Sequence, residues 1–248
     1  MIRIIAAKEL RSLFLSPLAW TILAVVEFIL AYLFLSSIDA YSLIQPRLQA
    51  LPNAPGITEL IVGPLFGNAA IVLLLVIPLL SMRTLAEEHR SGTISLLLSA
   101  PASMTEIVIG KYLGLIAFLA ILIGLLALMP LSLYAGGSLD LGRYAAALLS
   151  IGLLTAAFAA VGLFMSTLTR QPVIAAITTF GALLLLWILD WSSDQTGHAL
   201  ISQLSLLKHY QPLLNGLLRT SDIVFFLAFI AVFLALSIRR LDNQRIQG

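Results

Sequence analysis

The residues of this chain best placed to carry a function lie in a polar segment, residues 83–108, between two long apolar runs. Its EEHRSGT string supplies two adjacent acids, a base and a Gly-Thr pair: Glu87, Glu88, Arg90, Gly92 and Thr93. We expect Gly92 to end one helical turn and Thr93 to begin another, which Pro101 stops. Charged residues beside such a break suit docking to another protein. The alternative is a solvated loop with flanking charges.

Catalytic chemistry has little support in the sequence. Neither H-E-x-x-H nor G-x-S-x-G occurs, and the three histidines are scattered at His89, His198 and His209. The EE-x-x-x-R signature of CAAX-type intramembrane proteases is not met, because Gly92 stands where the arginine is required. The chain also lacks cysteine and the G-x-x-x-x-G-K-[ST] nucleotide-binding loop. We therefore expect no enzymatic activity, no metal site and no cofactor bound by this chain.

Glu27 is an acid near the middle of the first apolar run. A charged side chain at that depth costs at least about 2.5 kcal/mol, so Glu27 must face protein or water, or be protonated. Two interpretations stay open. One is a neutral acid hydrogen-bonded to a neighbouring helix, and the other is a proton-linked or substrate-contacting carboxylate, as in a proton-coupled secondary transporter.

The elements that must position these residues are membrane-spanning helices. Hydrophobic residues make up 60% of the chain, charged residues only 10%, and the mean hydropathy is +1.04, whereas soluble domains carry roughly 25% charged residues. The apolar runs are continuous and not alternating, so the predicted fold class is an all-α polytopic membrane protein. A bilayer core needs about 20 apolar residues per helix. Six stretches qualify: Leu18–Ser37, Ile61–Met82, Ile109–Leu131, Tyr144–Thr167, Pro172–Leu189 and Ile223–Ile238.

Small residues in these runs indicate where helices can pack closely. Gly110 and Gly114 are four residues apart, and a run rich in alanine ends at Gly162. Without bulky side chains at these positions, two helix backbones can approach each other.

The distribution of Lys and Arg predicts the orientation. With a cytoplasmic N-terminus, ten basic residues fall in cytoplasmic segments and four in external ones, out of 14. The ten are Arg3, Lys8, Arg11, Arg83, Arg90, Lys111, Arg170, Arg239, Arg240 and Arg245. We therefore predict one domain, residues 1–248, with both termini in the cytoplasm. The net charge of +2 reflects this bias, so we expect no nucleic-acid partner.

Residues 1–16, ahead of the first span, have an amphipathic pattern. At 100° per residue, apolar side chains gather on one side and Lys8, Arg11 and Ser12 on the other. This predicts a helix lying in the inner headgroup region of the bilayer. Pro17 then opens the first span, because proline is tolerated at a helix start. The alternative is a basic flank that only sets the orientation.

Residues 190–222, ahead of the last span, are too rich in leucine for a solvated linker. Leucines alternate with polar residues, which predicts two short amphipathic helices broken near Gln211 and Pro212. Neither piece is long enough to span a bilayer. We expect an external hairpin that dips into the outer leaflet, with Leu204, Leu207, Pro212 and Leu214 among its residues. The alternative is an anchor that lies on the surface.

The chain resembles ABC-type exporter permeases over nearly its whole length. Its opening fits the KE-x-x-x-x-F-x-SP pattern of an interfacial elbow helix in the gliding-motility-type branch, with Lys8, Glu9, Phe14, Ser16 and Pro17 in the matching positions. The EEHRSGT string is similar to the cytoplasmic coupling loop of that family, and the segment before the last span is similar to its external hairpin.

This resemblance implies a permease half that pairs with a second six-span half, identical or not, in a bacterial inner membrane. It also implies separate ATP-binding subunits that use ATP and Mg, and an accessory membrane subunit with an extracytoplasmic domain. The hairpin would narrow the external exit of the pathway. The substrate is not implied. A proton-coupled transporter using Glu27 and a purely structural scaffold are the alternatives, and copurification of an ATP-binding subunit separates them from the exporter.

Overall fold

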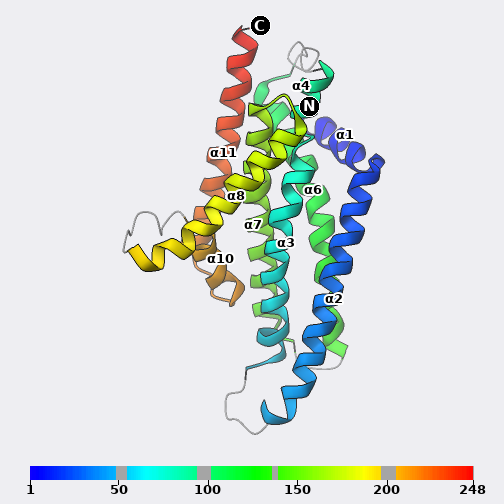
Figure 1. The fold of residues 1–248 in the computed structure, drawn as a ribbon, viewed down its shortest axis with the longest axis vertical. Helices are drawn as coiled ribbons and strands as arrows, with labels where there is room; N and C mark the ends of the chain where they lie inside the picture. Colours follow the sequence, from blue (N-terminus) through cyan, green and yellow to red (C-terminus); the bar gives the residue numbers. More distant parts are fainter. Residues whose placement is uncertain (49–54, 94–101, 136–138, 197–204, 248) are drawn as a thin grey trace.

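The structure, a computed structural model, is a bundle of long helices lying side by side (Figure 1). It describes residues 1–48, 55–93, 102–135, 139–196 and 205–247, and no strand occurs in these ranges. The elements are α1 (Ile2–Leu15), α2 (Pro17–Leu48), the π-helical turn η1 (Thr58–Val62), α3 (Gly63–Ser81), α4 (Ala86–Ser91), α6 (Met104–Leu131), the 3-10 turn η2 (Ser132–Ala135), α7 (Leu141–Leu168), α8 (Pro172–Thr196), α10 (Leu206–Leu214) and α11 (Thr220–Gln247). The predicted all-α fold is confirmed for the described residues.

Among the described residues, five helices are long and apolar enough to cross a membrane: Pro17–Arg47, Thr58–Ser91, Met104–Tyr134, Leu141–Leu168 and Thr220–Arg245. They contain the first to fourth and the last of the six predicted stretches. The fifth stretch lies in α8, whose described apolar part, Pro172–Ile188, is shorter. A membrane span at the fifth stretch, which would bring the number of spans to six, therefore stays a prediction. Helix α2 continues well past the predicted end at Ser37, because a helix need not stop where its apolar run stops.

The two ends of the bundle differ. Helices α1 and α4 and both chain termini lie at one end, which we call the α4 end (Figure 1). The C-terminal end of α2, η1 and the start of α7 lie at the other, which we call the far end. Because α3 and α7 finish at the α4 end while α6 and α8 begin there, the polar segment around α4 touches several helices at once.

Helix α7 forms the centre of the bundle and α2 and α11 form its flanks. In α7 61% of the apolar window is buried within the chain, against 22% in α2 and 17% in α11. The α3–α7 contact is close because Gly162 has no side chain, and a Cβ there would lie 2.6 Å from the Cβ of Ser81. The flanking helices leave broad apolar faces that only lipid or another protein can cover.

Helix α1 turns away from α2 at Ser16 and packs on α6 (Figure 1). Ser16 is extended, with φ −84° and ψ 126°, as the residue before a proline prefers, and Pro17 begins α2 as predicted. Gly110 and Gly114 provide the close approach. A Cβ added at Gly110 would lie 2.7 Å from the Cβ of Ile5, and one added at Gly114 would lie 2.9 Å from the carbonyl oxygen of Ala6. The small-residue pair therefore forms a seam within the chain.

Two sequence signals define where the helices around the polar segment begin and end. Gly92 follows α4 with φ +73°, a left-handed conformation that glycine adopts without steric cost, so the predicted helix stop is confirmed. Helix α6 begins with a reciprocal capping box between Ser103 and Glu106. The short helix predicted after Thr93 lies outside the described residues.

One short amphipathic helix of the predicted hairpin, α10, is present in the described residues, but the break expected near Gln211 and Pro212 is wrong. Helix α10 runs through Pro212 and ends at Asn215, where Gly216, with φ +89°, donates its N–H to the carbonyl of Leu213. Buried Tyr210, Leu213 and Leu214 hold the helix across the proline and outweigh the one hydrogen bond that proline removes. Leu204 lies outside the described residues.

The α1–α6 seam predicts opposite effects of one substitution at two glycines of α6. Gly114→Ala forces a Cβ against the α1 backbone, and overpacking of this kind costs about 1–3 kcal/mol. Gly124→Ala is the matched control, because a Cβ there meets nothing within 4 Å and alanine favours the helix by about 1 kcal/mol. Thermal unfolding in detergent should therefore show a lower Tm for Gly114→Ala and an unchanged or higher Tm for Gly124→Ala. Equal shifts would contradict the seam.

Candidate functional site

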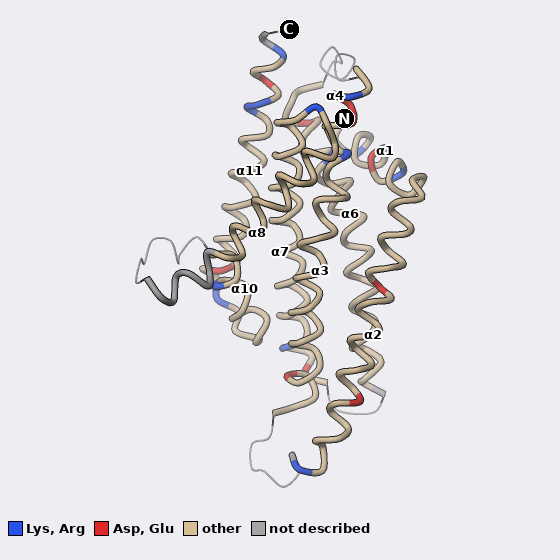
Figure 2. The backbone as a smooth tube through the Cα atoms, in the orientation of Figure 1, with Lys and Arg blue, Asp and Glu red and all other residues tan. Residues whose placement is uncertain are grey.

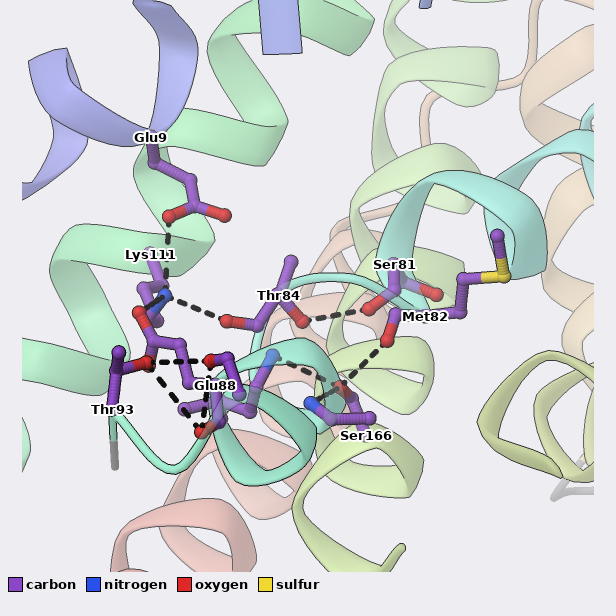
Figure 3. Close-up of polar contacts among 11 residues, drawn as sticks. Glu9, Ser81, Met82, Thr84, Glu88, Thr93, Lys111 and Ser166 are labelled. Atoms are coloured by element: carbon purple, nitrogen blue, oxygen red, sulfur yellow. Dashed lines mark hydrogen bonds and ion pairs between the residues drawn. The ribbon is translucent and has the colours of Figure 1, made fainter. Parts of the chain in front are cut away.

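The ammonium group of Lys111 joins three helices at the α4 end (Figure 3). Its Nζ lies 3.1 Å from Oε2 of Glu9 in α1 and 2.8 Å from Oε1 of Glu88 in α4. It also donates a hydrogen bond of 2.6 Å to the carbonyl oxygen of Thr84, in the turn between α3 and α4. An ammonium has three N–H donors, so each has a partner here. We call Glu9, Glu88 and Lys111 the ion cluster.

The ion cluster is buried. The side chain of Lys111 is 3% exposed, that of Glu9 13% and that of Glu88 18%. Burial raises the pKa of Glu9, while the neighbouring charge of Lys111 opposes this shift. Two carboxylates that share one ammonium each depend on it, because an uncompensated buried charge is expensive. Lys111 is therefore the residue whose loss leaves the largest uncompensated charge.

Local folding explains how the ion cluster forms. Lys111 lies in the second turn of α6, directly after Gly110, and the glycine seam lets α1 come close enough for Glu9 to reach it. The short α4 begins after the turn at Thr84, which places Glu88 on the face turned toward α6. The glycine seam thus brings Glu9 to Lys111, and the turn before α4 brings Glu88 to it.

A hydroxyl group fastens the start of α4 to α7 (Figure 3). The backbone N–H groups of Leu85 and Ala86 donate to Oγ of Ser166, at 3.1 Å and 2.9 Å, and Ser166 donates in turn to the carbonyl of Met82 at 3.4 Å. The first N–H groups of a helix have no partner within the helix, so Ser166 supplies one from outside. Helix α4 is therefore held at its start by α7 and at Glu88 by the ion cluster.

The other predicted docking residues of the polar segment lie on its outer surface. Glu87, Arg90, Gly92 and Thr93 are exposed, and Glu87 makes only a loose ion contact of 3.8 Å with Arg83. Glu88 differs from them because it points inward to Lys111. Of the five predicted residues, Glu88 therefore binds the interior of the protein and the other four lie on its surface.

The elbow residues named by the sequence pattern have distinct contacts. Glu9 belongs to the ion cluster, whereas Lys8 is exposed. The ring of Phe14 packs against Trp20 and Phe118, at centroid distances of 5.5 Å and 5.3 Å. Ser16 accepts a hydrogen bond of 3.1 Å from Arg83. These contacts tie α1 and Ser16 to the start of α2, to the middle of α6 and to Arg83, just after α3.

Lys111 is not among the site residues that the sequence predicts, where it counts only as one of the basic residues on the cytoplasmic side. A signal was present, because a lysine within the first turns of a membrane-spanning helix needs a partner or an exit to water. What the sequence did not reveal is which carboxylates would serve, since Glu9 is distant along the chain.

Glu27 lies on α2, apart from the residues of the ion cluster. Its Oε1 is buried and has no hydrogen-bond partner within the described part of the chain. The two interpretations of this acid both stay predictions. Among the described residues, no group of three or more His, Asp or Glu side chains is arranged to hold a metal ion.

A second polar junction lies near the far end, around Arg143 of α7. Its Nη1 lies 2.8 Å from Oε2 of Glu59 in η1, and its Nε donates at 3.1 Å to the carbonyl of Asn215, directly after α10. Helix α10 itself packs on α7, where the hydroxyl of Ser150 donates to the carbonyl of Tyr210 at 3.2 Å. Burial raises the pKa of Tyr210, whose hydroxyl donates to the carbonyl of Phe66.

Residues 3–245 match the family model described as ABC-2 family transporter protein. No curated protein matches the chain.

The ion cluster predicts a non-additive pattern of stability. Lys111→Met leaves two carboxylates buried without their cation, and breaking a buried pair costs about 3–5 kcal/mol. Adding Glu9→Gln and Glu88→Gln removes the stranded charges, so the triple variant should recover most of that loss in a thermal unfolding assay. Arg90→Met, at an exposed position of α4, is the control and should unfold as the wild type does. A single Lys111→Met variant as stable as the wild type would refute the cluster.

Proposed function

The chain belongs to the ABC-2 family of transporter proteins and is a permease component of an ABC transporter, and we propose that it forms half of the pathway of an ATP-driven exporter. Separate ATP-binding subunits supply the energy by hydrolysing ATP with Mg. The observation that carries the proposal is the bonding of Lys111, which ties an exposed helix, α4, to α1 and α6.

The α4 end faces the cytoplasm in this proposal. Most Lys and Arg residues lie at that end, on α1, around α4 and on the last turns of α11, with few near the far end (Figure 2). Basic residues favour the cytoplasmic side of a membrane protein. Both termini then lie in the cytoplasm of a bacterium whose inner membrane holds the protein, and α1 lies in the inner headgroup region as an elbow helix.

Helix α4 is the coupling helix. Glu87 and Arg90 present charges to a partner, while Glu88 and Ser166 connect α4 to the spans behind it. A push on α4 by an ATP-binding subunit would therefore move α1, α6 and α7 together. Because packed helices shift as whole elements, a small displacement at one end reaches the other.

Helix α10 belongs to an external hairpin that enters the outer leaflet and narrows the exit. It has nine residues, too few to cross a bilayer that takes about 20. Its Tyr210 bonds to Ser150, which lies about 14 Å along α7 from Leu141 at 1.5 Å per residue. That depth supports a segment that dips inward from the far end, and Arg143 fixes its return at Asn215.

The assembly has two permease halves. The large apolar faces of α2 and α11 suit a second six-span copy, identical or different, and the surrounding lipid. Helix α8 supplies the fifth of the six spans of each half. The elbow pattern favours the gliding-motility branch and an accessory subunit with an extracytoplasmic domain.

The coupling role of α4 predicts the effect of a charge reversal. Arg90→Glu should leave expression and Tm unchanged, because the side chain is exposed. It should weaken binding of the ATP-binding subunit by about a hundredfold or more in a copurification assay, since a reversed charge at an interface costs several kcal/mol and each 1.4 kcal/mol is a factor of ten. Arg245→Glu, exposed near the end of α11 at the same end, is the control. Full retention of the ATP-binding subunit by Arg90→Glu would remove α4 from the interface.

A proton-coupled transporter is the second candidate, favoured by the buried and unpartnered Oε1 of Glu27. The two candidates predict different results for Glu27→Gln. In the ATP-driven exporter this variant should keep ATP-dependent transport in reconstituted vesicles within about twofold of wild type, because a neutral amide replaces a protonated acid at small cost. Abolished transport at normal expression would support the proton-coupled mechanism instead.

A further inference from the structure

A cavity of about 230 Å³ opens between α1, the start of α2, the end of α3 and α4. One wall carries polar side chains from α1 and from the α3–α4 region, among them Lys8, Ser12, Arg83 and Glu87. The other wall is apolar, with Leu18 and Leu79. Glu9, Glu88 and Lys111 of the ion cluster also line the cavity. This volume is below the ~300 Å³ at which pockets for drug-sized molecules begin, and it suits a small polar group.

The charges that line the cavity balance in sign. They are Lys8, Arg83 and Lys111 against Glu9, Glu87 and Glu88. Within the ion cluster, Lys111 already pairs with Glu9 and Glu88. Lys8, Arg83 and Glu87 therefore remain to contact a ligand. A simple anion would meet Glu87 and the excess carboxylate of the ion cluster. A ligand that carries both a phosphate and an ammonium group fits this set better.

The remaining charged groups have weak contacts that such a ligand can replace at low cost, namely the ion contact between Arg83 and Glu87 and the hydrogen bond from Arg83 to Ser16. Glu87 and Arg83 are 55% and 39% exposed and lie 3.8 Å apart, a loose contact of the kind that contributes little to stability. Lys and Arg both bind phosphate oxygens through charge-assisted hydrogen bonds. Glu87 can accept hydrogen bonds from a primary ammonium, whereas a quaternary ammonium has no N–H to donate.

An apolar track leads away from the cavity along α3. Ile71, Leu75 and Leu79 are spaced four residues apart, so they share one helix face, and they are 52%, 54% and 42% exposed. The track is about 12 Å long at 1.5 Å per residue, and Leu79 is also part of the cavity wall. A polar headgroup cavity joined to an exposed apolar stripe is the shape of a site for a molecule with a polar head and an acyl chain.

We propose that this cavity binds the headgroup of a zwitterionic aminophospholipid from the inner leaflet, with the phosphate at Lys8 and Arg83 and the primary ammonium at Glu87. The inference rests on the proposed orientation, in which α1 lies at the level of the inner headgroups. Bound there, the lipid fills the space between the elbow and α4 and holds the two together beside the ion cluster.

The test measures lipid selectivity of the purified full chain after delipidation. Phosphatidylethanolamine, phosphatidylcholine and phosphatidylglycerol with the same acyl chains are added separately, and Tm and the lipid retained in native mass spectrometry are recorded. Phosphatidylethanolamine should raise Tm by about 5 °C more than the other two, because a ligand that binds only the folded state stabilises it. Equal effects of all three lipids, or a preference for phosphatidylglycerol, would overturn the proposal.

Variants locate the site. Lys8→Gln with Arg83→Gln should abolish the preference for phosphatidylethanolamine, and Glu87→Gln should remove its advantage over phosphatidylglycerol. Arg3→Gln, exposed on the same helix, is the control and should behave as wild type. Should the double variant fold poorly, Lys8→Gln alone, at an exposed position, should still reduce the preference. Unchanged selectivity in these variants would place the lipid elsewhere.

Two further arms separate the alternatives. Soluble O-phosphoethanolamine should need at least a tenfold higher concentration than phosphatidylethanolamine to give the same rise in Tm. Equal concentrations for the same rise would mean that the natural ligand is a free phosphate compound. Lys8→Gln with Arg83→Gln should still copurify the ATP-binding subunit, and Arg90→Glu should keep the lipid preference. Loss of subunit binding in that double variant would assign this cavity to the partner protein instead of lipid.

Discussion

One buried ammonium group organises the α4 end of this protein. Lys111 supplies the only cation within bonding distance of two carboxylates, in the part of the chain that the structure describes, and each carboxylate comes from a different helix. Since neither acid can be buried alone at acceptable cost, α1, α4 and α6 must keep their relative positions as long as the charges are paired. The ion cluster therefore holds the three helices together, because breaking a buried ion pair costs more free energy than breaking an exposed one.

Near the far end Arg143 also joins several elements, but its side chain is more exposed to solvent than that of Lys111. Arg143 contacts Glu59 and the carbonyl of Asn215, and it is 33% exposed, whereas Lys111 is 3% exposed. A more hydrated ion pair holds less strongly. The contacts of Arg143 should therefore break at lower cost than those of Lys111.

Sequence reasoning predicted the elements better than their contacts. Hydropathy, Pro17 and Gly92 determine local backbone choices, so the long helices, the bend before α2 and the end of α4 could all be predicted. Glu88 was predicted as a docking residue together with Glu87 and Arg90, because nothing in a single sequence tells which face of a six-residue helix points inward. That direction depends on Lys111 and Ser166, which are distant in sequence. The break in α10 was misplaced for a related reason, since tertiary packing of Tyr210 outweighs the local effect of Pro212.

The central claim is that the ion cluster carries movement from α4 to the far end. The cysteine-free chain allows spin labels at Ser132, directly after α6, and at Ser221, at the start of α11. The distance between them can be measured by pulsed electron paramagnetic resonance in the complex with the ATP-binding subunits, with and without ATP. The account predicts that ATP changes this distance in the wild type, but not in the folded triple variant Lys111→Met, Glu9→Gln, Glu88→Gln. An equal ATP-dependent change in that variant would contradict the claim.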